Sequence, residues 1–231
     1  RKEECIVYSA HWDHLGKGEP VNGDSIYNGA ADDASGVAAL LEIAHAFTLQ
    51  AEKPSRSILF LAVTAEEQGL LGSEYYTKHP VFPLQKTVAD INIDVMHPFG
   101  KMKDLIVVGK GQSELDTYIE DAAQKQGRIT RAEPDPSGGW YFRSDHFNFA
   151  KVGIPSLYIE NGSDSRVHGE SWGEAQKKLY NDNRYHAPSD EYTSDWDISG
   201  IVEDMQLLYE VGKKLSEEHV FPGWKTGSEF K

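Results

Sequence analysis

Residues 58–63 and the two glutamates that follow them constrain the fold more than any other stretch of the chain. Ile58–Val63 has the sequence Ile-Leu-Phe-Leu-Ala-Val, an unbroken apolar run rich in strand-forming residues. It predicts a strand that is buried on both faces. Glu66 and Glu67 follow where this strand should end, and ligands collect outside the carboxyl ends of strands in α/β sheets. Two adjacent carboxylates need a cation nearby, unless they are a solvated pair that opens a loop.

Strands and helices alternate along the rest of the chain. Further strands are predicted at Cys5–Ala10, Val88–Asp94, Leu105–Val108 and Ser156–Ile159. Helical spacing of apolar residues predicts helices over Val37–Phe47, Ser73–Lys78, Leu115–Ala123 and Ile198–Leu215, and a helical turn at Phe147–Ala150. This alternation predicts an α/β fold, a three-layer αβα sandwich with a mixed, largely parallel central sheet. No internal repeat or interdomain linker interrupts residues 1–231, so we expect a single domain.

Three polar stretches carry no periodic pattern and are expected to be loops. Lys17–Gly29 is rich in Gly, Asn and Asp, and Pro134–Gly139 is rich in Pro and Gly. Glu160–Ser194 is a long polar stretch, and loops of this length are usually functional or disordered.

The composition excludes some classes of partner and site. The net charge of −14 argues against a nucleic-acid or anionic-membrane partner. No apolar run approaches the roughly 18 residues needed to span a bilayer. Cys5 is the single cysteine, so neither an intrachain disulfide nor a multi-cysteine zinc site can form. The chain begins at Arg1, almost directly in a strand, and we expect that further chain, including any targeting segment, precedes it.

Polar residues at strand ends, or in the loops after them, form a set of imidazoles and carboxylates. They are His11, Asp13, Asp32, Glu66, Glu67, Asp94 and His186. Each has an ordinary explanation alone, such as helix capping by Asp32. Together they suit zinc or a similar divalent ion. A carboxylate-rich set also suits two adjacent cations, because one aspartate can bridge both.

Five motifs in this order carry a family resemblance. They are Ser9-Ala10-His11-Trp12-Asp13, Gly29-Ala30-Ala31-Asp32-Asp33-Ala34-Ser35-Gly36, Ala65-Glu66-Glu67-Gln68-Gly69-Leu70-Leu71-Gly72-Ser73, Ile93-Asp94 and Tyr185-His186. The chain resembles the di-zinc aminopeptidases of the M28 metallopeptidase family from residue 5 to about residue 210. The resemblance implies a zinc-exopeptidase-like fold and two zinc ions per chain. Residues 1–231 would then be an M28-like catalytic domain that lacks N-terminal segments of the full-length protein.

The resemblance also assigns roles to individual residues. His11 and Asp94 would bind one zinc, and His186 and Glu67 the other. Asp32 would bridge both ions.

Asp13 would orient the imidazole of His11, as residues around metal ligands commonly do. Glu66 would be the general base that takes a proton from water activated by zinc and delivers it to the leaving amine. The substrates would be peptides with a free N-terminus.

Several residues near these motifs have more than one interpretation. Tyr141 matches a family tyrosine that binds substrate or stabilises the oxyanion, although a loop aromatic packed on the core explains it equally well. Ser144-Asp145-His146 also matches a family motif that is not a metal site, and Asp145 would support the pocket. The ligand set leaves out His14, His97 and His168, since structural and surface histidines are the commoner case. We assign no chemistry to Cys5.

Three alternatives stay open. A carboxypeptidase-type enzyme would need a basic pocket for the substrate carboxylate, for which Arg143 and Arg184 are candidates. A glutaminyl cyclase resembles the family in fold but uses one zinc, and the intact Glu66-Glu67 pair favours the peptidase. A receptor-like protein with a decayed site would lack ligands, and none is missing. The family is often exported, so we expect a periplasmic or secreted protein; the oligomeric state is not indicated.

Overall fold

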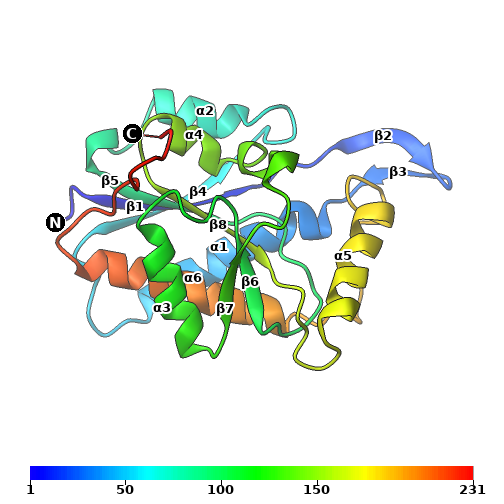
Figure 1. Ribbon diagram of the computed structural model, residues 1–231. Coiled ribbons are helices and arrows are strands. Elements are labelled where there is room, and N and C mark those ends of the chain that lie inside the picture. Colours follow the sequence, from blue (N-terminus) through cyan, green and yellow to red (C-terminus); the bar gives the residue numbers. More distant parts are fainter. Residues whose placement is uncertain (231) are drawn as a thin grey trace.

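A six-stranded sheet forms the centre of the protein in the computed structural model, which describes residues 1–230 (Figure 1). Its strands, in spatial order, are β4 (Ser57–Val63), β1 (Cys5–His11), β5 (Thr87–Asn92), β8 (Ser156–Asn161), β6 (Asp104–Val107) and β7 (Ile129–Ala132). Neighbouring strands are parallel, except that β6 is antiparallel to β8. The sheet is therefore mixed and largely parallel, as predicted.

Helices cover both faces of the sheet, which confirms the three-layer αβα arrangement (Figure 1). One face carries α1 (Ser35–Thr48), α3 (Leu115–Lys125) and α6 (Ser199–Glu217). The other face carries α2 (Leu71–Lys78) and α4 (His146–Lys151). The helix α5 (Glu170–Asn183) lies at the end of the molecule toward which β1 runs.

The two faces bury apolar surface unequally. The α1/α3/α6 layer closes the main core, in which Tyr8 stacks on Phe60 and Leu208 is fully buried. The α2/α4 layer closes a smaller cluster around Val7, Tyr76 and Phe149. Both clusters hold the strands rigidly, so the loops at the carboxyl ends of β1, β4 and β5 start from fixed positions.

Two predictions were wrong: the burial of strand 58–63 on both faces, and the irregular loop at residues 17–29. β4 is an edge strand among the described residues, and most of its side chains are half-buried instead of buried on both faces. Lys17–Gly29 is not an irregular loop but mainly a hairpin of β2 (Gly16–Val21) and β3 (Asp24–Tyr27) that projects from the body (Figure 1). Its Asn22-Gly23 turn has positive φ at both residues, which is a hairpin signal, but its exposed strands show no apolar alternation.

Two further segments contain regular secondary structure that the sequence did not predict, namely residues 160–194 and Ile129–Ala132. Residues 160–194 contain the end of β8 and the whole of α5, which buries only Gly173 and Tyr180 and therefore lacks a strong apolar stripe. The strand β7 was not predicted, because its short sequence is mostly exposed.

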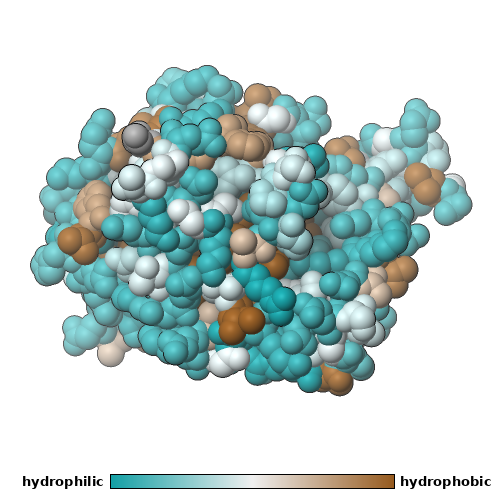
Figure 2. All heavy atoms as spheres, viewed as in Figure 1, coloured by the Kyte–Doolittle hydropathy of each residue, from teal (hydrophilic) through white to brown (hydrophobic). Residues whose placement is uncertain are grey.

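The surface agrees with the acidic composition. The face seen in Figure 2 is mostly hydrophilic, with apolar residues scattered over it. Within residues 1–230, the structure contains no helix that is both long enough and apolar enough to span a lipid bilayer.

Candidate active site

The predicted imidazoles and carboxylates gather at the carboxyl ends of three adjacent strands. His11 is the last residue of β1, Asp94 lies two residues beyond β5, and the Glu66-Glu67 pair follows β4. β1 lies between β4 and β5 in the sheet. Parallel neighbours end at the same edge, so these side chains converge there. Asp32 reaches them from the turn before α1, and His186 from the loop after α5.

Asp32 divides its two carboxylate oxygens between two sets of neighbours. On one side, His11 Nε2 lies 3.2 Å from Asp32 Oδ1 and 3.5 Å from Asp94 Oδ1. On the other, His186 Nε2 lies 3.3 Å from Asp32 Oδ2 and 3.1 Å from Glu67 Oε2. The structure thus forms two three-residue groups that share Asp32, which we call the inner half (His11, Asp32, Asp94) and the outer half (His186, Asp32, Glu67).

These separations fit ligands of a tetrahedral metal ion. Bonds of 2.0–2.1 Å to zinc place neighbouring ligand atoms about 3.3 Å apart. Within residues 1–230, His11 Nε2 and Asp94 Oδ1 are also buried without a hydrogen-bond partner. Buried polar atoms without partners are rare unless an ion or water completes them. The donor set therefore fits a divalent cation in each half.

In the metal-free site, the pKa values of the histidines are raised and that of Asp32 is lowered, so the site favours positive charge beside its carboxylates. Burial alone would lower the pKa of His11, but the adjacent carboxylates of Asp32 and Asp94 raise it well above its usual range. Hydrogen bonds with Asp32 and Glu67 raise the pKa of His186 to about 10. Burial opposes ionisation of Asp32, yet the bonds from both histidines outweigh it and lower the pKa. Protons on the imidazoles thus balance the carboxylates when no metal does.

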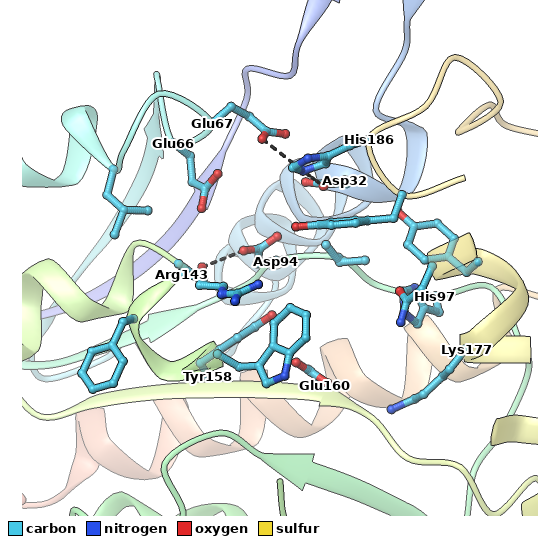
Figure 3. A pocket seen from close by; sticks show the side chains of 18 of the residues that line it. Asp32, Glu66, Glu67, Asp94, His97, Arg143, Tyr158, Glu160, Lys177 and His186 are labelled. Atoms are coloured by element: carbon cyan, nitrogen blue, oxygen red, sulfur yellow. Dashed lines mark hydrogen bonds and ion pairs between the residues drawn. The ribbon is translucent and has the colours of Figure 1, made fainter. Parts of the chain in front are cut away.

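The two adjacent glutamates point in different directions (Figure 3). Glu67 faces His186, whereas the Glu66 carboxylate points into the cavity, on the side of Asp94. Burial, and next the charge of Asp94, raise the pKa of Glu66 to about 9. Burial also opposes ionisation of Glu67, but the close contacts with His14 and His186 lower its pKa. The structure therefore separates a carboxylate among metal ligands from one that faces open space.

Asp13 contacts the site in a different way from the one expected. The atom nearest to His11 Nδ1 is the main-chain oxygen of Asp13 at 3.0 Å, and the carboxylate lies 3.7 Å away. The carboxylate instead accepts a hydrogen bond of 3.2 Å from the backbone N–H of Glu66. Asp13 thus links the His11 ring to the turn that carries Glu66, through its main chain and side chain respectively.

Asp32 and Asp33 do not act as simple helix caps. Asp33 Oδ1 accepts from the N–H groups of Gly36 at 2.9 Å and Val95 at 3.2 Å, so it ties the start of α1 to the loop after β5. Asp32 makes no cap bond and faces both histidines.

A cavity of about 500 Å³ opens beside the two halves (Figure 3). Its wall away from the metal ligands is largely aromatic, formed by Trp140, Phe142, Tyr158, Tyr180 and Tyr185. Charged side chains also line it, namely Arg143, Glu160 and Lys177. Ligand pockets commonly combine an apolar wall with a few polar groups in this way.

Tyr141 does not line this cavity. It is buried against His146, with the ring centroids 4.6 Å apart, and it stacks on Phe230. Our expectation that Tyr141 binds substrate finds no support in this position, which agrees with a loop aromatic packed on the core. Its neighbours Trp140 and Phe142 line the cavity instead.

Other residues weighed in the sequence fall into distinct places. His97 lines the cavity and packs on Phe99 and Tyr180, whereas His168 packs on Trp172 beside a second cavity. Arg143 reaches the first cavity, and Arg184 lines the second.

The Ser144-Asp145-His146 motif contacts the site through hydrogen bonds of its first two residues. Ser144 donates a hydrogen bond of 2.6 Å to Asp94 Oδ2, and Asp145 accepts one from Ser73. Burial raises the pKa of Asp145 to about 7.

Asp190 is a part of the site that our sequence reasoning did not identify. It is fully buried, and its carboxylate accepts hydrogen bonds from the backbone N–H groups of Ala31 and Asp32, each at 3.1 Å at the closest. Its own backbone oxygen accepts from Ala30 at 3.0 Å. The only sequence signal was its position four residues after His186, in a stretch without periodicity.

Comparison with known proteins identifies the family of this chain and several similar proteins. The model of peptidase family M28 matches residues 1–209. Leupeptin-inactivating enzyme 1 of Streptomyces exfoliatus is 29% identical over 177 residues, which are 74% of this chain and 39% of that protein. Aminopeptidase YwaD of Bacillus subtilis is 28% identical over 194 residues, which are 82% of this chain and 36% of that protein. The chain thus spans less than half the length of these relatives.

Solved structures share the fold at lower identity. The aminopeptidase LapA of Legionella pneumophila superimposes with a TM-score of 0.69 at 20% identity, covering 94% of this chain and 52% of that chain. A glutaminyl cyclase of Porphyromonas gingivalis has a TM-score of 0.56 at 18% identity, covering 95% of this chain and 74% of that chain. Likeness at this level of identity bears on the fold alone.

Proposed function

The chain belongs to peptidase family M28, and on this premise we propose that it is the catalytic domain of a zinc aminopeptidase. The observation that carries the proposal is the division of Asp32 between two histidines, each with one further carboxylate at the distance expected for ligands of a metal ion. We propose that the inner and outer halves hold one Zn²⁺ each. The names of the relatives, which include aminopeptidases, support the same class of activity.

The two metals and the chain have separate tasks in the reaction. When bound, the two zinc ions supply positive charge that polarises the scissile carbonyl and favours ionisation of water and of Glu66. Glu66 faces the cavity and accepts the proton of the attacking water at its carboxylate. It then delivers this proton to the leaving amine. Glu67, Asp94 and Asp32 stay ionised, since they are the proposed metal ligands.

The position of the site explains why the free end of a peptide would bind there. The carboxylates at the strand ends attract the α-amino group of the substrate, and the aromatic wall receives the first side chain. We propose peptides with a free N-terminus as substrates, and we keep the expectation that the protein acts after export. One relative is named vacuolar membrane protease, at 31% identity over 86 residues.

A carboxypeptidase-type activity is the second candidate, and Arg143 is the observation that favours it. Its side chain lies over the Trp140 ring and lines the same cavity, where it can pair with a substrate carboxylate. Arg184, the other basic residue considered, lines the second cavity and so does not contribute. A single-zinc glutaminyl cyclase is less well supported, because donors for two metals are in place.

Metal content and substrate preference, measured on one sample, test the proposal. We expect two zinc ions per chain by mass spectrometry, cleavage of aminoacyl anilides and no cleavage of N-blocked peptides. Cleavage of N-blocked peptides at their C-terminus would favour the carboxypeptidase instead. One zinc with cyclisation of N-terminal glutamine would favour the cyclase.

Two neighbouring substitutions test the division of the glutamate pair. Glu66→Gln should keep both zinc ions and lose about 10²–10⁴-fold in kcat, the usual contribution of a general base. Glu67→Gln, one residue away, should instead weaken zinc binding. Near-normal turnover in Glu66→Gln would contradict the role of Glu66.

A further inference from the structure

His14 lies in direct contact with a proposed metal ligand, although it was left out of the ligand set. Its Nδ1 atom is 2.7 Å from Glu67 Oε1. The other oxygen of Glu67, Oε2, lies 3.1 Å from His186 Nε2. The two carboxylate oxygens of Glu67 therefore face two different imidazoles.

The distances distinguish these two imidazoles. The separation between His186 and Glu67 equals the spacing of two ligands on one zinc ion, about 3.3 Å. The separation between His14 Nδ1 and Glu67 Oε1 is shorter and is that of a close ion pair. His14, Asp32 and Glu67 also lie close enough together to hold a metal ion, but the short contact favours a pairing of His14 with the Glu67 carboxylate over a place in the ligand set.

The His14 ring is held in a fixed position by its surroundings. Its side chain is 6% exposed. Gly29 has a φ of +64°, and a Cβ atom at this position would lie 2.5 Å from His14 Cγ. The ring of His186 packs edge-on against it, with the ring centroids 5.7 Å apart. The space that receives His14 therefore exists because residue 29 has no side chain.

We propose that His14 is a positioning residue of the outer half. Its close contact with Oε1 fixes the rotation of the Glu67 carboxylate, so that Oε2 is directed at the metal position beside His186. This rests on the two-zinc site of the proposed function. Outer groups of this kind usually contribute 10–100-fold to metal affinity.

A matched pair of substitutions isolates this polar contact. The amide nitrogen in His14→Asn takes the place of Nδ1 and can still donate, whereas His14→Leu has nearly the same shape as Asn and no donor. Zinc dissociation constants of the metal-free proteins are measured by competition with a coloured chelator. We expect His14→Leu to weaken one of the two zinc sites by about 10–100-fold. His14→Asn should stay within about threefold of the unsubstituted protein, and both should bind the second zinc normally.

The outcomes that would overturn the role of His14 differ from the outcome that would overturn the proposed function. His168→Leu, in the second cavity, should leave both constants unchanged. Equal zinc binding by His14→Leu and the unsubstituted protein would overturn the proposal, and so would an equally large loss in His14→Asn, which would make His14 a metal ligand. If the unsubstituted protein binds fewer than two zinc ions, the proposed function itself fails. Circular dichroism of each metal-free variant verifies folding, and His14→Gln replaces any variant that does not fold.

Discussion

The inner and outer halves of the proposed metal centre share Asp32 but differ in how the fold supplies them. In the inner half, the side chain of His11 is 1% exposed and that of Asp94 is 9% exposed. In the outer half, the side chain of His186 is 37% exposed. His11 ends a central strand, whereas His186 comes from a loop that follows the most exposed helix. The sheet therefore fixes the inner half, and local contacts must fix the outer half.

Removing each histidine in turn should have the largest effect and should separate the halves. His11→Ala and His186→Ala should each lose one zinc. In the metal-free protein at pH 7, His11→Ala should also lower the free energy of unfolding by about 3–5 kcal/mol, because it leaves buried carboxylates without their cation. His186→Ala should cost less, since its imidazole is 37% exposed and solvent screens its ion pairs. Urea denaturation in the presence of a chelator measures both, and equal losses would remove the distinction between the halves.

The same difference explains what the sequence could predict. The strand-end residues of the site follow from periodicity, because apolar runs locate the ends of β1, β4 and β5, and His11, Glu66 and Asp94 lie at or just beyond them. The bridging place of Asp32 and the sorting of the ligands between two metals came only from the family resemblance. His186 lies in a stretch without a periodic pattern, and only its place in a motif indicated a role. Asp190 and two residues of the cavity wall, Tyr180 and Tyr185, belong to the same stretch. Their positions depend on how α5 packs against the site, and the sequence of α5 does not show this.

Two other differences between expectation and structure have the same physical origin. Tyr141 and Phe142 are adjacent in one short helical turn, and tertiary packing decides which of them enters the core. In the β2–β3 hairpin, β2 is exposed along its whole length and β3 alternates only between exposed and half-buried residues. The hairpin therefore lacks the apolar alternation by which strands are recognised.

Asp190→Asn should affect both halves, because Asp190 holds the backbone of the shared residue Asp32. An amide at this position loses one of the two acceptors that face the N–H groups of Ala31 and Asp32. We expect zinc affinity to fall by about 10–100-fold at both sites. Ser189→Ala, one residue away and exposed, should leave both affinities unchanged and serves as the control. A loss confined to one zinc in a chelator competition would place Asp190 in that half alone.

A further comparison is between His11 and His146, two equally buried histidines of which only His11 has carboxylate neighbours. His146→Gln tests whether burial without carboxylates keeps a histidine neutral, and its expected effect on stability is smaller than those above. His146 is as buried as His11, but it packs between the rings of Tyr141 and Tyr158. Burial lowers the pKa of His146 to about 3, whereas the pKa of His11 is raised. The unfolded chain takes up a proton on this histidine near its usual pKa of about 6.5, and the folded protein does not. Stability is therefore fully present above pH 6.5 and is lost as the pH falls toward 3.

His146→Gln removes this titrating group, so the part of the acid-induced loss of stability that comes from His146 should disappear. Between pH 5.5 and pH 4, the free energy of unfolding of the unsubstituted protein should fall more steeply than that of the variant, by about 1.4 kcal/mol per pH unit. Denaturation of the metal-free proteins over this range measures the two slopes, and other titrating groups cancel in their difference. His45→Gln on the surface of α1 provides the matched exchange. Identical slopes in His146→Gln and the unsubstituted protein would mean that His146 is charged in the folded state, and burial alone would then not separate it from His11.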